Sequence, residues 1–182
     1  MIKLKELFDA QTIDDEWQIK LSLSGDGGDI YYLDVSPYVY MFQATGEDSY
    51  MDFAIELFQN VISTADDGAI LNDRYFGWKD DASGITKGVG VNNGTEVSLA
   101  ESRGMRTVAR MLWVLSKSPT YLEKGSNRAI FNSMLSWFQT NIWNKWESRG
   151  IGHLYRSRTH MASHWGQMGW FLYEITGNEK YK

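Results

Sequence analysis

The chain has 182 residues, of which 43% are hydrophobic and 14% aromatic, with 8 Trp, 2 Pro and no Cys. This composition predicts one globular domain over residues 1–182 and excludes disordered, collagen-like and disulfide-stapled proteins. The formal net charge of -5 is unevenly spread, because residues 1–81 hold 17 Asp/Glu and 5 Lys/Arg, whereas residues 82–182 hold 6 and 13. Either the two halves attract each other within the domain, or the basic half faces an anionic partner.

The first residues carry no apolar segment typical of a signal peptide, and no stretch is long and apolar enough to predict a membrane span. We therefore expect no membrane partner, and the sequence leaves open whether the chain is cytoplasmic or exported as part of a larger protein. The overall acidity disfavours nucleic-acid binding, although the basic second half keeps that alternative open.

In chain order, the first predicted element is a short strand or hairpin over residues 17–23, where large apolar residues alternate with polar ones before a glycine-rich turn. Residues 35–45 are apolar over most of a helical circumference, which is typical of an inner helix. Between residues 50 and 62 the apolar residues recur at helical spacing on one side only, which predicts an amphipathic outer helix.

The same order then returns twice. Residues 97–116 and 162–175 have the apolar pattern of inner helices, and residues 130–142 have the one-sided pattern of an outer helix. Long connections over residues 66–94 and 146–160 precede the second and third inner helices, and loops of this length often carry functional residues.

A short motif recurs at the end of each inner helix. An apolar stretch leads into a small polar turn and then a tyrosine, at Tyr50, Tyr121 and Tyr181. The turn contains Gly46 in the first copy and Gly177 in the third. Glycine readily takes the left-handed conformation that ends a helix, so both residues suit a helix end. We expect each tyrosine to pack its ring back between the two helical layers.

An apolar helix, a turn close to T-G-[DEN]-x-x-Y and an amphipathic helix resemble the helical hairpin of the (α/α) toroid proteins, over residues 33–182. These proteins include the six-hairpin glycosidases and the alginate-type polysaccharide lyases. The resemblance implies a mainly all-α fold of antiparallel helical hairpins forming an incomplete (α/α) toroid. It also implies a carbohydrate-active function, and a further outer helix after Lys182 if the chain is a portion of a longer protein.

Parallel inner helices would bring their N-termini to one end of the domain, where unpaired N–H groups favour anionic ligands. Polar and aromatic residues gather at or near these predicted N-termini, and we expect several of them to bind substrate. The candidate substrate-binding residues are Asn92, Arg156, Tyr31, Tyr32 and Trp165.

All three histidines fall within residues 153–164, next to two arginines and without an acidic residue between them. A histidine can act as a base near neutral pH, a tyrosine can donate a proton to a leaving oxygen, and an arginine can hold a carboxylate. The resemblance to the lyases adds an asparagine that helps to neutralise that carboxylate. The candidate catalytic residues are therefore His164, His160, Tyr155, Arg158 and Asn93.

Two alternatives remain for these histidines. His164 shares a helical face with large apolar residues and can be a core residue instead. His160 and His164 are four residues apart, a spacing that suits metal binding, but no third ligand is evident, so we expect neither a metal nor a cofactor.

Glu101 is a second candidate because it lies on the apolar side of its predicted helix, where a charge is costly unless it is paired or catalytic. With Asp34 or Glu96 it could form the carboxyl pair of a glycoside hydrolase. Alternatively, it lies in the first helical turn, where its charge suits the helix dipole. On the opposite side, Arg103, Arg106 and Arg110 form either a solvated face or a surface that pairs with the acidic half.

The sequence thus favours a polysaccharide lyase that cleaves a uronate-containing glycan by β-elimination, with an anionic oligo- or polysaccharide as its partner. Two other functions stay open. One is a six-hairpin glycoside hydrolase, and the other is a non-catalytic helical module that binds glycan or protein.

Overall fold

The computed structural model describes residues 2–10, 12–66, 73–80, 85, 95–154 and 159–182. Throughout these residues the fold is helical, and the β-structure consists of two isolated bridges, Asp66–Gly77 and Asp80–Thr95. The prediction of a mainly all-α fold is confirmed. The helical elements are α1 (Ile2–Asp9), α2 (Thr12–Ser22), α3 (Gly27–Ile30), α4 (Ser36–Thr45), α5 (Asp48–Ser63), α6 (Ser98–Ser116), α7 (Pro119–Leu122), α8 (Asn127–Phe138), η1 (Gln139–Asn144, a π-helix), α9 (Lys145–Ser148), η2 (Ile151–His153), α10 (Thr159–Thr176) and η3 (Glu179–Tyr181).

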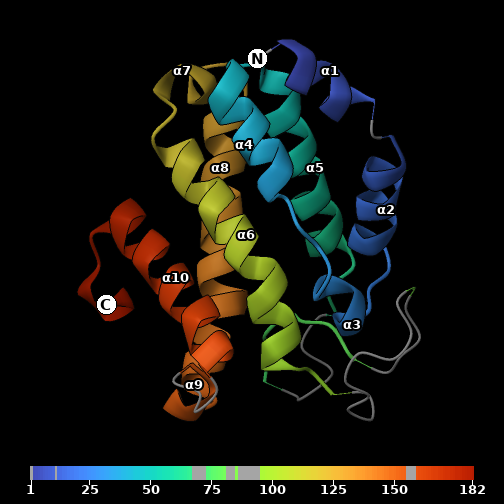
Figure 1. Cartoon of the computed structure of the whole chain (residues 1–182). Coiled ribbons are helices and arrows are strands. Elements are labelled where there is room, and N and C mark those ends of the chain that lie inside the picture. The colour runs from blue at the N-terminus through green and yellow to red at the C-terminus, as the bar shows by residue number, and fades with distance from the viewer. Residues whose placement is uncertain (1, 11, 67–72, 81–84, 86–94, 155–158) are drawn as a thin grey trace.

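The long helices form two layers (Figure 1). Helices α4, α6 and α10 lie side by side in the front layer and run in the same direction, so that their N-termini all point toward the lower end of the molecule. Helices α5 and α8 lie behind them and run in the opposite direction. We call α4, α6 and α10 the inner helices, and their open side the inner face.

The strand predicted over residues 17–23 is wrong, because residues 17–22 belong to helix α2. The alternation of apolar and polar residues indicated a strand only because α2 directs polar side chains inward. Gln18 accepts a hydrogen bond from the backbone N–H of Asp34 at 2.9 Å, and the buried Leu21 follows three residues later. Trp17, by contrast, is 39% exposed. Spacings of three and four residues therefore describe the buried side better than a spacing of two.

The recurring tyrosines do anchor the layers. Tyr50, Tyr121 and Tyr181 are all buried, and Gly46 and Gly177 adopt positive φ angles of 74° and 69° at the turns that precede two of them. Each hydroxyl bonds to a side chain that lies earlier in the chain. Tyr50 donates to Asp9 at 2.5 Å, Tyr121 donates to Asp52, and Tyr181 accepts from Gln139 at 2.8 Å. Each anchor thereby ties its own turn to an element earlier in the chain, which is α1 for Tyr50, α5 for Tyr121 and η1 for Tyr181.

Candidate functional site

The inner face carries three arginines of α6 in one stripe. Arg103, Arg106 and Arg110 are spaced by three and four residues, so that they lie on the same side of the helix over about 10 Å. None of the three forms an ion pair with any residue that the structure describes. The sequence left open whether the stripe pairs with acidic residues of the N-terminal half, and within the described residues it does not.

Tyrosines of the N-terminal half meet these arginines instead. The Arg103 guanidinium lies over the ring of Tyr31, 4.3 Å from its centroid, and donates to the Tyr31 carbonyl oxygen. Arg110 lies over the ring of Tyr40 at 4.3 Å and donates to its hydroxyl at 2.7 Å. Cation–π contacts of this kind hold the guanidinium groups in place without neutralising their charge.

A small polar pocket of about 60 Å³ opens where α4, α6 and α10 meet. Ser36, Arg106, Arg110 and Gln167 supply its polar groups, from all three inner helices. The Nε atoms of Arg106 and Arg110 are buried and have no hydrogen-bond partner in the described part of the chain. A buried N–H donor without an acceptor destabilises the fold. The pocket therefore suits a small anion, such as a carboxylate, that accepts these hydrogen bonds.

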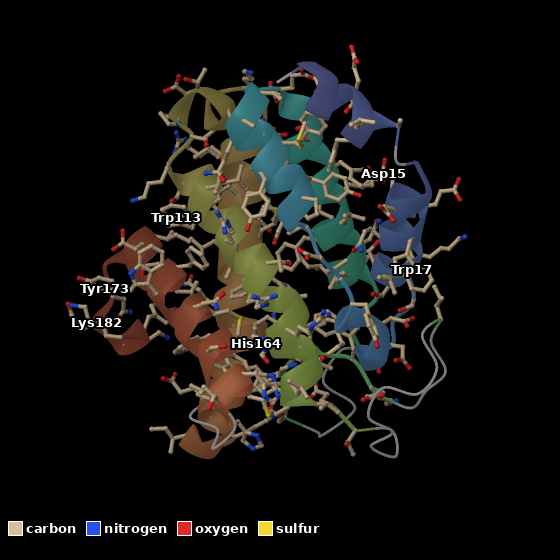
Figure 2. The ribbon with its side chains drawn as sticks, in the orientation of Figure 1. Asp15, Trp17, Trp113, His164, Tyr173 and Lys182 are labelled. Atoms are coloured by element: carbon tan, nitrogen blue, oxygen red, sulfur yellow. The ribbon has the colours of Figure 1, made fainter. Side chains whose placement is uncertain are left out.

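His164 lies on α10 close to this stripe, and its side chain is half-buried. Burial lowers the pKa of the His164 imidazole, and the positive charges of Arg106, His160 and Arg103 add to this effect, so that the pKa falls to about 4. The ring nitrogen Nδ1 lies 3.4 Å from the hydroxyl of Ser102, across the α6–α10 contact. His164 is therefore neutral at neutral pH and can accept a proton there. Figure 2 shows it where α6 and α10 meet.

A buried network of charges lies behind the first turn of α6. The Lys145 ammonium donates to Glu101 at 2.8 Å, to Glu96 at 2.9 Å and to the Phe76 carbonyl at 3.0 Å. The other oxygen of Glu101 accepts from the Trp146 indole at 2.7 Å, and Arg149 pairs with Glu96. Burial raises the pKa of the Glu101 carboxyl, and the attraction of Lys145 opposes that rise.

This network changes how Glu101 is interpreted. The residue does lie in the first turn of α6, as predicted, but both of its oxygens are occupied and its side chain is buried. Asp34 lines a different pocket, together with Asp14, Asp15 and Gln18. The two carboxyls contact different groups, so the structure does not bring them together as an acid and a base.

The structure brings only some of the other predicted residues together. Tyr31 and Tyr32 lie beside Arg103, and His160 lies one turn before His164, with 6.4 Å between their ring centroids. Trp165 is buried and lines a separate apolar groove on the other side of α10. Five predicted residues lie outside the described part of the chain: Asn92, Asn93, Tyr155, Arg156 and Arg158.

Sequence reasoning missed Lys145 and Gln167. The sequence indicated Lys145 only indirectly. A carboxylate such as Glu101 on the apolar side of a helix is costly to bury unless a cation pairs with it. That cation is 44 residues away in the chain, and nothing in the local pattern distinguishes it from a surface lysine. Gln167 could have been found from its position three residues after His164, on the same side of a helix.

Within the described residues, no helix is long and apolar enough to cross a membrane, and no group of His, Asp and Glu is placed to hold a metal ion. Comparison of the chain with protein-family models, with curated protein sequences and with solved structures found no match.

Proposed function

We propose that the inner face binds a uronate-containing glycan and cleaves it by β-elimination. One observation carries this proposal: a neutral histidine lies beside guanidinium groups that have no carboxylate partner among the described residues. A uronate brings both the carboxylate that such arginines bind and, on the adjacent carbon, the proton that such a base removes.

In the proposed reaction, Arg106 holds the uronate carboxylate and neutralises its charge, with Arg103 nearby. His164 removes the proton from the carbon next to the carboxylate. The electrons of that C–H bond form a carbon–carbon double bond, and the bond from the next carbon to the glycosidic oxygen breaks. The leaving oxygen takes a proton from an acid, a role for which the sequence nominates Tyr155.

The lowered pKa of His164 is compatible with this role. Part of the lowering comes from the positive charge of Arg106 and Arg103. A bound carboxylate offsets that charge, so the pKa of the imidazole rises when substrate binds, and His164 becomes a stronger base at the moment it is needed. His160, which is exposed on the first turn of α10, is the second candidate for the base.

The helical arrangement supports the wider proposal of an (α/α) toroid arc. The inner helices run parallel to one another and the outer ones antiparallel to them, so that the N-termini of the inner helices point toward the same end (Figure 1). Exposed tyrosine rings at positions 32 and 40 offer stacking surfaces for sugar rings along the inner face. These features also suit a glycan-binding module without catalysis, which is the second candidate function. The hydrolase is less well supported, because Glu101 is enclosed by its partners.

The experiment is incubation of the protein with alginate, pectate and glycosaminoglycans. A lyase generates an unsaturated uronate that absorbs in the ultraviolet, a hydrolase generates reducing ends without that absorbance, and a binding module generates neither. We expect His164→Gln and Arg106→Gln to remove the absorbance, and Ser163→Ala, an exposed position on the same helix, to keep it. The assignment of the base would be refuted if a double variant that carries both His164→Gln and His160→Gln kept full activity.

A further inference from the structure

The side chain of Ser102 meets the imidazole of His164 in the contact between α6 and α10, and it is fully buried there. Ser102 lies one residue before Arg103 and four before Arg106, so that one helix carries all three. Its hydroxyl oxygen contacts two groups, the carbonyl oxygen of Leu99 at 3.1 Å and the ring nitrogen Nδ1 of His164 at 3.4 Å. The reaction proposed above gives this serine no role.

The hydroxyl of Ser102 has a single hydrogen, so it can donate to only one of these two neighbours. The Leu99 carbonyl oxygen is the closer one, and serines in helices commonly bond to a carbonyl about one turn earlier. If the hydrogen pointed toward Nδ1 instead, two oxygen atoms would face each other at 3.1 Å without a hydrogen between them. The hydrogen therefore belongs to the Leu99 contact, and toward His164 the hydroxyl is an acceptor.

This acceptor decides where the proton of the neutral imidazole lies. A neutral ring carries one N–H group, and the hydrogen bond that one nitrogen makes sets the state of the other. Because Ser102 accepts from Nδ1, Nδ1 carries the hydrogen and Nε2 keeps its lone pair. No residue that the structure describes forms a hydrogen bond with Nε2. The charged groups near the ring are Arg106, His160 and Arg103, and a guanidinium offers no acceptor to an N–H group at Nε2.

We propose that Ser102 is a positioning residue that holds His164 in the Nδ1–H form, so that Nε2 takes the proton from the glycan. The identity of the reaction rests on the proposed function, whereas the choice of nitrogen rests on the Ser102 contact. When Nε2 takes the proton from the carbon next to the carboxylate, the ring becomes an imidazolium with an N–H group on each nitrogen. Ser102 still accepts from Nδ1–H in that state, and the bond is stronger because its donor is then charged.

Helix α6 thus positions both the carboxylate and the base. Arg103 and Arg106 determine where the carboxylate binds, and Ser102 determines which ring nitrogen is ready to accept a proton. A ring without this contact is free to adopt the other tautomer or to turn, and small misplacements of reacting groups slow a reaction strongly. Loss of the Ser102 hydroxyl should therefore lower kcat, whereas KM should change little because the arginines still hold the carboxylate.

The first test reads the tautomer from the chemical shifts of the ring nitrogens, by NMR of protein with isotope-labelled histidine. The measurement is made at neutral pH, where the His164 ring is uncharged because its pKa lies at about 4. The spectrum of His164→Gln identifies the signals of His164 among those of the three histidines. We expect the wild type to carry the hydrogen on Nδ1, and Ser102→Ala to contain a measurable fraction of the Nε2–H form.

The second test measures elimination by the same variants on the glycan that the wild type cleaves fastest. Ser102→Ala should lose about tenfold or more in kcat with little change in KM. Ser102→Thr keeps the hydroxyl and should restore the Nδ1–H form together with part of the rate. Ser116→Ala is the matched control, because Ser116 makes the same kind of bond on the same helix, to the Trp113 carbonyl at 2.7 Å. It should keep the wild-type tautomer and rate.

The inference is overturned if His164 of the wild type carries its hydrogen on Nε2, a result that depends on no variant. It is also overturned if folded Ser102→Ala keeps the Nδ1–H form as fully as the wild type does. Both results count whether or not a glycan is cleaved. If no glycan gives the ultraviolet absorbance while His164 is in the Nδ1–H form and responds to Ser102→Ala, the proposed function fails and the tautomer assignment stands.

Discussion

Replacing Lys145 with methionine tests the buried charge network. The ammonium group donates its three N–H groups to two carboxylates and one carbonyl, and the lysine side chain is fully buried. Methionine fills most of the same volume but leaves Glu96 and Glu101 buried together without that cation. Breaking a buried pair by removing one partner costs about 3–5 kcal/mol, which is a large share of the roughly 5–15 kcal/mol that stabilises a typical domain.

The loss of stability in Lys145→Met should depend on pH. Folding raises the pKa of the Glu101 carboxyl above its ordinary value of 4.5. Such a carboxyl contributes to stability at pH values below 4.5, and this contribution is lost as the pH rises through the raised pKa. Without Lys145 the pKa of Glu101 rises further, so the loss extends to higher pH. The variant should therefore be close to the wild type in acid and fall behind as the pH approaches neutrality.

The assay is urea unfolding followed by tryptophan fluorescence at several pH values. Lys117→Met, at an exposed lysine, is the control and should stay within about 0.5 kcal/mol of the wild type. Adding Glu101→Gln to Lys145→Met should recover part of the lost stability at neutral pH, since it removes one of the stranded charges. A loss for Lys145→Met that is below about 1 kcal/mol, or that does not change with pH, would refute the reasoning.

Three further predictions follow from single contacts. In Gly77→Ala the new methyl group would lie 1.4 Å from Glu96 Oε1, so thermal unfolding should show a loss of about 3 kcal/mol, whereas Gly152→Ala, where the methyl group meets nothing within 4 Å, should change little. Tyr121→Phe removes the bond to Asp52 and should cost about 1–2 kcal/mol in urea unfolding, and an unchanged midpoint would show that the tyrosine anchors by its ring alone. A proton NMR titration of His164 should give a midpoint at about 4 that moves upward in Arg106→Gln, and a wild-type midpoint near 6.5 would contradict the burial of this ring.

Sequence alone was sufficient for most of the long helices, because a buried helix side leaves a period close to 3.6 in the pattern. The inner helix expected over residues 97–116 is α6, and the one expected over residues 162–175 is α10. The tyrosine motif also located the turns, since Gly46 and Gly177 take the left-handed conformation that their positions require. The pattern failed at α2, where the buried side of a helix is partly polar and hydrophobicity no longer marks it.

What the tertiary structure decided is which charges meet. Three arginines on one side of α6 were evident from their spacing, but spacing cannot tell whether acidic residues come to meet them. In the folded chain they face tyrosine rings and a neutral histidine, while Glu101 on the other side finds Lys145. Pairing of this kind depends on segments that are 44 to 72 residues apart, and helical periodicity carries no information over that range.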